Sequence, residues 1–342
     1  LTNSYRNLCK LNLERKNKQM ALHYFEKAKH TFEKIPNPNP RKKAQFYFDE
    51  ANMLFKQREI TASSLAIERV FKTLIPAYSS AKTVLPNQSA LYAETILLDV
   101  LDLQAELFLT QSQPKKALES YALAFHIEAL FQSLLVYENS KIIIQIRNRN
   151  RTERCIAIYQ SLFQKENKKN YLESAFLLAE KTKSIVLKAN LNLKKFQSHE
   201  EKLLLEQLQN HNTIIVKEQQ KGATAAISKI NDALKKQNEL MLLLKETQSK
   251  KGNTTKTEID LKELYTKLEK DNSILIEYFS GNDKTYSFTL TDKQISLNSF
   301  SNEAHTSLQI AQFIDYFNNA NAIANDVAGF SHYGNRIYKL LK

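Results

Sequence analysis

A pattern of small and aromatic residues recurs along the first half of this 342-residue chain. Its members are spaced 0, 4 and 7, so each set shares one face of an α-helix. The sets are Ala21, Phe25 and Ala28; Ala117, Tyr121 and Ala124; and Cys155, Tyr159 and Leu162. Further small residues, Cys9 and Ala105, stand 12 positions before the first two sets. Because small side chains let two helices approach closely, the pattern predicts stacked helical hairpins.

The pattern resembles the tetratricopeptide repeat, a helix–turn–helix unit of about 34 residues. The best match lies at residues 95–126, with Pro114 in the turn between its two helices. We predict further units up to residue 32, around 51–70, and over 140–163, the last with a long inter-helix loop. Residues 1–195 should then form a repeat superhelix. A generic helical bundle is the alternative, because any amphipathic helix can carry such a stripe.

Two further regions follow the predicted repeats. After a helix at 171–191, residues 196–252 predict a long helical hairpin turning at Gly222, or else one long coiled helix. In residues 258–342 the spacing of the apolar residues changes from a helical period to the alternation typical of strands. We predict a helix at 260–270 and an antiparallel meander of strands between 273 and 300. We expect Ser301 to cap a following helix, and we expect one face of the meander to carry Tyr286, Phe288 and Leu290. The predicted fold class is mostly α, with a small α+β module at the end.

Two motifs in the second half of the chain carry a family resemblance. The helical motif comprises Ala175, Phe176, Ala179, Glu180, Lys181 and Ser184. The hairpin motif comprises Leu275, Glu277, Tyr278, Phe279, Gly281, Tyr286, Phe288 and Thr291. Both resemble the bacterial CHAT family, in which tetratricopeptide repeats precede a caspase-like cysteine peptidase domain. The resemblance implies that 258–342 is the first portion of such a domain and that the peptidase His and Cys lie beyond residue 342. We therefore assign no catalytic residue here and expect no peptidase activity from this chain.

The composition excludes several kinds of site. The five glycines lie too far apart for a GxGxxG fingerprint, a Walker loop or a GxSxG elbow. Cys9 and Cys155 form neither a disulfide framework nor a CxxC metal site, so we predict free, buried thiols. We expect no cofactor and no metal. No apolar run approaches ~18 residues, so we expect no membrane span. A cytoplasmic location is expected, although the chain starts at Leu1 and a targeting segment could have preceded it.

The net charge of +13 is spread among interspersed acidic and basic residues. Its densest basic run contains Arg147, Arg149, Arg151 and Arg154. With neighbouring aromatic residues this run is a candidate phosphate-binding patch. We favour a polar inter-helix loop, because no nucleic-acid-binding motif accompanies the charge. The sequence therefore predicts no nucleic-acid partner.

The first helices of repeat units line the concave surface of such arrays. In the unit at 95–126 that face carries Asp99, Asp102 and Glu106, at positions i, i+3 and i+7. The corresponding positions in the preceding unit are Phe48, Asp49, Asn52 and Phe55. We predict a groove that binds a protein or peptide, with an acidic stripe suited to Lys or Arg and an apolar anchor site. A solvated helix face is the alternative.

Three functional hypotheses follow. The first is a sensor arm that binds a partner and regulates or positions a caspase-like module. The second is a cysteine endopeptidase whose His and Cys lie beyond residue 342. The third is an assembly scaffold in which the open sheet edge pairs with another chain. It arises because a three-stranded sheet cannot by itself cover apolar side chains such as Ile274, Ile276, Tyr286 and Phe288.

Overall fold

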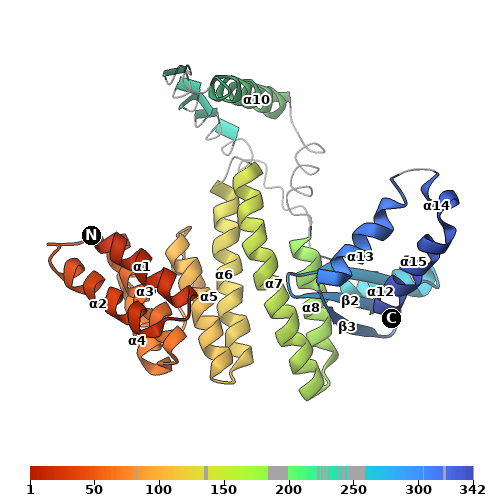
Figure 1. The fold of residues 1–342 in the computed structure, drawn as a ribbon, viewed down its shortest axis with the longest axis horizontal. Coiled ribbons are helices and arrows are strands. Elements are labelled where there is room, and N and C mark those ends of the chain that lie inside the picture. Colours follow the sequence, from red (N-terminus) through yellow and green to blue (C-terminus); the bar gives the residue numbers. More distant parts are fainter. Residues whose placement is uncertain are drawn as a thin grey trace.

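The computed structural model describes residues 1–79, 81, 83–134, 138–183, 199–221, 259–302, 304–318 and 321–341, with scattered positions between 224 and 244. Up to residue 183, the described residues form consecutive helix pairs that stand side by side (Figure 1). The pairs are α1 (Thr2–Glu14) with α2 (Lys18–Glu33), α3 (Pro40–Gln57) with α4 (Ile60–Leu74), α5 (Thr95–Thr110) with α6 (Pro114–Leu134), and α7 (Glu138–Glu166) with α8 (Lys169–Thr182). A short 3-10 helix, η1 (Gln88–Ala90), precedes α5. The predicted mostly helical architecture, built from helical hairpins, is confirmed.

The turn inside each pair has the same backbone geometry. Each turn contains a non-glycine residue in the left-handed conformation, with φ of 59°, 69°, 58° and 50° at Lys16, Arg58, Ser112 and Asn167. In the first three turns the next amide donates to a carbonyl five residues back: Asn17 to Asn12, Glu59 to Leu54, and Gln113 to Phe108. These bonds satisfy carbonyls that the end of an α-helix would leave unpaired. The turn is therefore a structural repeat even though the sequence offers no glycine for it.

These turns fix which face of each second helix is buried. Five residues after each left-handed residue begins a triple at spacing 0, 4 and 7 whose members are at most 2% exposed. The triples are Ala21, Phe25 and Ala28; Ser63, Ile67 and Val70; Ala117, Tyr121 and Ala124; and Leu172, Phe176 and Ala179. In most triples the outer positions hold small residues, which allow close helix packing, and the middle position holds a larger side chain that fills the space between the helices. The predicted burial of Ala105, Ala117 and Ala124 is confirmed, since all three are 0% exposed.

The fourth pair departs from the prediction in both register and connection. Residues 140–163 belong to the continuous helix α7, so the predicted inter-helix loop is wrong. Cys155, Tyr159 and Leu162 accordingly lie on the first helix of the pair rather than the second. The first part of the helix expected after the repeats, at 171–191, is instead the second helix of this pair, α8, and residues 184–191 lie outside the described residues. A 0, 4, 7 stripe occurs on both helices because both are amphipathic, so local spacing could not separate them.

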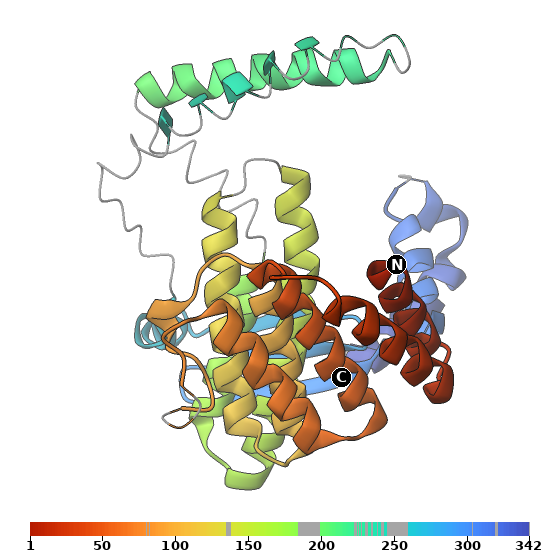
Figure 2. The ribbon, with the colours of Figure 1, turned by 90° about the vertical axis from the view of Figure 1, so that its left-hand side faces the viewer.

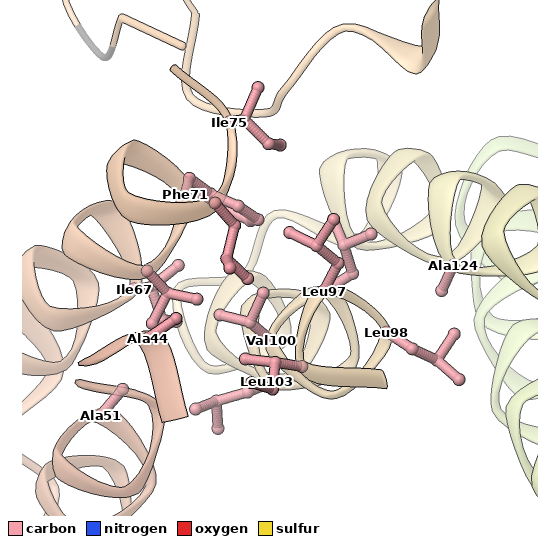
Figure 3. Close-up of a cluster of buried hydrophobic side chains, with 14 of the residues drawn as sticks. Ala44, Ala51, Ile67, Phe71, Ile75, Leu97, Leu98, Val100, Leu103 and Ala124 are labelled. Atoms are coloured by element: carbon pink, nitrogen blue, oxygen red, sulfur yellow. The ribbon is translucent and has the colours of Figure 1, made fainter. Parts of the chain in front are cut away.

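A core rich in leucine and isoleucine joins the second and third pairs. Figure 3 shows Ile67 and Phe71 of α4 beside Leu97 of α5, while Leu98 points toward Ala124 of α6. Helix α5 is buried over most of its circumference, with Ile96, Leu97, Leu98, Val100 and Leu101 each at most 2% exposed. Burial on two sides makes α5 the central helix of the array. The remaining face of α5 carries Asp99, Asp102 and Glu106, which we call the acidic stripe.

The C-terminal module contains the predicted meander. Its elements are α12 (Leu261–Lys270), β1 (Leu275–Ser280), β2 (Lys284–Leu290), β3 (Ile295–Ser301), α13 (Ala304–Asp315), α14 (Ala322–Asn325) and α15 (Val327–Leu341). The described strands pair antiparallel in the order β1-β2-β3, with Ser287 opposite both Tyr278 and Asn298. Asp260 caps α12, because its Oδ1 accepts the Lys262 amide at 2.9 Å. The predicted cap at Ser301 is wrong, since Ser301 extends β3 opposite Lys284.

One face of the sheet is covered by the fourth helix pair. Phe288 and Tyr286 are 0% and 1% exposed, and the Phe288 ring meets Phe176 of α8 edge-on at 5.8 Å between centroids. The same cluster includes Ile156 of α7 and Leu172 of α8. The cover that the sheet was expected to lack over Tyr286 and Phe288 is therefore supplied by the fourth helix pair. On the other face, Ile274 and Ile276 are exposed, as a sheet with an open side requires.

The predicted hairpin at 196–252 is described only in part. Helix α10, drawn in green in Figure 2, spans His199–Gln219, and Gly222 lies outside the described residues. Ser184 of the helical motif also lies outside them. Within the described ranges, no helix combines the length and the apolar character needed to cross a bilayer.

Substitution of Ala117 tests the packing register of the helix pairs. Ala117 has no exposed surface and lies in a cluster with Ala105, Phe108 and Cys155. Ala117→Leu should overpack this contact and lower the free energy of unfolding by about 1–3 kcal/mol. Urea unfolding followed by circular dichroism measures the change.

Ala122→Leu is the matched control, because Ala122 is exposed on the same helix. We expect it to change stability by no more than about 0.5 kcal/mol. Equal stability of the two variants would contradict the assigned register.

Candidate functional site

The first helices of the second, third and fourth pairs enclose a pocket of about 370 Å³. Six of the seven positions predicted for the groove line this pocket, and they come from two separate helices. Asp49 does not line it, because its side chain is buried and pairs with Arg6 and Lys10. Helix α3 contributes Phe48, Asn52 and Phe55, and helix α5 contributes Asp99, Asp102 and Glu106. Lys56, Leu103, Tyr121, Arg147, Asn150, Arg151 and Arg154 complete the lining. The periodicity of two helices thus located the pocket, but it did not predict the wall formed by α7.

The wall formed by α3 carries two aromatic residues, Phe48 and Phe55, beside the polar residues Asn52 and Lys56. Phe48 and Phe55 are half-buried and pack against the leucine-rich core, so their rings are held in place while part of each ring still faces the pocket. Leu103 of α5 adds aliphatic surface beside them. Apolar walls with a few oriented polar groups are typical of ligand-binding pockets.

Arginines of α7 pair with the acidic stripe of α5. Arg147 contacts Asp99, Arg151 contacts Asp102, and Arg154 contacts Glu106. The acidic residues are spaced 3 and 4 apart and the arginines 4 and 3 apart, so each set occupies one face of its helix. We call this set of contacts the ion-pair ladder. It links the third and fourth helix pairs across the pocket.

Arg151 is the buried centre of the ladder. Its Nε and a terminal nitrogen both meet the Asp102 carboxylate at 2.7 Å, which is a bidentate contact. On its other side Arg151 contacts Glu128 of α6 at 2.7 Å, and the side chains of Arg151 and Glu128 are 2% and 0% exposed. Burial raises the pKa of Glu128, and the charge of Arg151 opposes that shift. Arg151 therefore joins helices α5, α6 and α7 at one point.

Glu106 holds the outer end of the ladder with a second partner. The Tyr121 hydroxyl donates to Glu106 Oε1 at 2.7 Å, and Arg154 contacts the same oxygen. Burial and the neighbouring Glu106 carboxylate raise the pKa of Tyr121, so this hydroxyl keeps its proton. Glu106 is thereby held in one orientation at the pocket edge.

The ion-pair ladder corrects two interpretations of the sequence. Asp99, Asp102 and Glu106 line the groove as predicted, but they face arginines of the same chain rather than a free surface. The basic run is helical, so its assignment to a polar loop is wrong. A signal was available in the sequence, because Arg147, Arg151 and Arg154 have the spacing of one helical face. The predicted burial of the free thiols Cys9 and Cys155 is confirmed.

The opposite side of α7 holds the turn between β1 and β2. The Glu153 carboxylate accepts backbone amides of Asn282, Asp283 and Lys284 at 2.6, 3.0 and 2.7 Å. Glu153 is 6% exposed, and this cluster of donors compensates for the burial of its charge. A Cβ atom at Gly281 would lie 2.2 Å from Glu153 Cδ, so glycine is required for this close approach.

Asn150 connects the pocket with that turn. It lines the pocket, and its Oδ1 accepts Asn282 Nδ2 at 2.7 Å. Arg149 donates to the Ser280 carbonyl at 2.6 Å. Helix α7 therefore contacts the groove on one side and the C-terminal module on the other.

Comparison with known proteins adds no family to this description. No protein family, curated protein or solved structure matched the chain.

Removal of Arg151 tests the buried centre of the ladder. Arg151→Met keeps much of the aliphatic stem but leaves Glu128 buried without its counter-ion. We expect a loss of about 3–5 kcal/mol in the free energy of unfolding at neutral pH. Because the native-state pKa of Glu128 is raised, its burial costs least when protonated, so the loss should shrink as the pH falls below neutral.

Adding Glu128→Gln to Arg151→Met is the control. The double variant should recover part of the lost stability and lose the extra pH dependence, because the Glu128 carboxylate is no longer there to titrate. Unfolding titrations of both variants and the parent chain over a pH series measure this. A loss that is the same at every pH in the single variant would contradict the assignment to Glu128.

Substitution of Gly281 tests the attachment of the strand turn to α7. Gly281→Ala places a methyl group where the Glu153 carboxylate lies, so the carboxylate must move away from its amide donors. We expect destabilisation by about 1–3 kcal/mol, from the loss of hydrogen bonds to a buried charge. Chemical unfolding measures it.

Glu153→Gln gives the matching half of a double-mutant cycle. Both changes disturb the same contact, so the double variant should be destabilised by clearly less than the sum of the single variants. Additive losses would show that Gly281 and Glu153 act independently.

Proposed function

We propose that this protein is a polypeptide-binding module whose groove holds a segment of a partner protein. The observation that carries the proposal is the pocket formed jointly by α3, α5 and α7, the first helices of three successive pairs. Arrays of helical hairpins bind partners on the surface made by such helices. The proposal thus takes up the sensor-arm hypothesis from the sequence.

The pocket is organised before any partner binds. The rings of Phe48 and Phe55 are fixed by the core beneath them, and the arginines and carboxylates are held by one another. A site whose side chains are already ordered loses less conformational entropy on association. This favours a binding role over a solvated helix face.

The position of α7 supports a link between binding and the C-terminal module. A partner in the groove would contact Asn150, which also bonds Asn282 in the β1–β2 turn. We therefore propose that partner binding positions the C-terminal module. The CHAT resemblance of that module stays a proposal, supported by the meander that follows α12. The tetratricopeptide assignment is supported by the turn geometry that repeats in each pair.

Filling the pocket tests the proposed function. A random peptide library displayed on phage is selected against the full chain, and selected peptides are then measured by fluorescence anisotropy. Asn52 is a half-buried polar residue in the pocket wall, so Asn52→Trp should occupy the space that a peptide needs. We expect the selected peptides to bind this variant at least about tenfold more weakly, equivalent to ~1.4 kcal/mol.

Gln164→Trp is the matched control, because Gln164 is exposed on α7 and does not line the pocket. It should leave peptide affinity unchanged. The proposed function fails if selection yields no binding peptide, or if the selected peptides bind the Asn52→Trp variant as well as the parent chain.

A further inference from the structure

The charged groups of the pocket are unequally exposed. The side chains of Arg147 and Arg154 are 44% and 56% exposed, whereas their partners Asp99 and Glu106 are 26% and 30% exposed. The central pair has the opposite order, with Asp102 32% and Arg151 2% exposed, but Arg151 engages both oxygens of the Asp102 carboxylate. At the two outer pairs an incoming chain therefore meets guanidinium groups more readily than carboxylates.

The arginines also keep hydrogen-bonding capacity. A guanidinium has five N–H donors, and each of these exposed ion pairs engages one terminal nitrogen of the arginine. Lys56 stands at the same pocket, is exposed, and forms no ion pair with the described residues. These groups can donate to further carboxylates without first breaking the ladder.

The rest of the pocket narrows the class of ligand. Phe48 and Phe55 offer a surface for an aliphatic or aromatic side chain. The carboxylates of α5 interrupt the positive charge of the pocket, and this interruption fits the separate carboxylates of a peptide better than a continuous phosphate backbone. The overall charge of +13 would speed the approach of an acidic partner.

We propose that the groove binds an extended acidic segment of another polypeptide. An apolar side chain of that segment packs against Phe48 and Phe55, and flanking carboxylates pair with Arg147, Arg154 and Lys56. The inference rests on the proposed peptide-binding function and adds the chemistry of the partner. It replaces the Lys- or Arg-rich partner expected from the sequence, because arginines of the chain itself already occupy the acidic stripe.

Labelled synthetic peptides test the inference on the full chain by fluorescence anisotropy. One probe has a central Leu flanked by Glu, the second has the same Leu flanked by Lys, and the third has Ser in place of Leu between the Glu residues. We expect the first probe to bind most tightly. The basic probe should bind weakly, and the probe without Leu should lose affinity because it lacks the apolar anchor.

Substitutions in the ion-pair ladder should change the affinity for acidic and for basic probes in opposite directions. Asp99→Asn with Glu106→Gln removes repulsion and frees the arginines, so affinity for the acidic probe should rise about three- to tenfold. Arg147→Gln with Arg154→Gln should lower it by a similar factor. Lys56→Gln, which breaks no ion pair among the described residues, should also lower it, and it provides a test if a ladder variant does not fold.

Matched surface variants separate the groove from the general charge of the protein. Lys29→Gln with Lys34→Gln removes two exposed positive charges on and after α2, away from the pocket lining. Glu14→Gln with Glu33→Gln removes two exposed negative charges in the same region. Neither pair should change the affinity for the acidic probe by more than about twofold.

Each of the remaining outcomes would contradict a different part of the inference. Tighter binding of the basic probe, abolished by Asp99→Asn with Glu106→Gln, would overturn the acidic partner but keep the groove as a peptide site. Equal sensitivity to the Lys29 and Lys34 changes would show attraction by overall charge only. Stronger binding of an oligouridine probe that depends on Arg147 and Arg154 would assign the site to nucleic acid. Failure of every probe, together with failure of the peptide selection, would reject the proposed function itself.

Discussion

The buried contact between Arg151, Asp102 and Glu128 sets the position of α7 in the array. With Arg151 2% exposed and Glu128 0% exposed, neither charge can lose its partner without large cost, so α7 cannot slide along α5 and α6. The position of α7 then determines where Glu153 and Asn150 meet the strand turn. The groove and the C-terminal module therefore depend on the placement of one helix.

The same ladder gives the groove its chemistry. An acidic stripe alone would attract basic ligands, but arginines of α7 neutralise it, and Arg147 and Arg154 remain more exposed than the carboxylates they pair with. Phe48 and Phe55 of α3 add a surface for a hydrophobic side chain. The charged and aromatic side chains of the groove are already held in place by their neighbours. This order limits the conformational entropy lost when a partner binds.

Sequence periodicity predicted one part of this site and missed another. Asp99, Asp102 and Glu106 share a helical face that cannot join the leucine-rich core, and this alone directs them to a surface or a groove. Their partners lie 48 or 49 residues later in the chain. No local pattern gives that pairing, because it requires the stacking of successive helix pairs. The arginine spacing was informative, but its polar neighbours suggested a loop.

The sequence alone determined the first three helix pairs, the buried small residues such as Ala117 and Ala124, and the order of strands in the meander. These features follow from side-chain size and from the periods of 3.6 and 2, which act over a few residues. The tertiary structure decided that the fourth helix pair covers the sheet and that α7 neutralises α5. Both depend on bringing distant segments into contact, where burial and charge pairing are properties of two surfaces rather than of one.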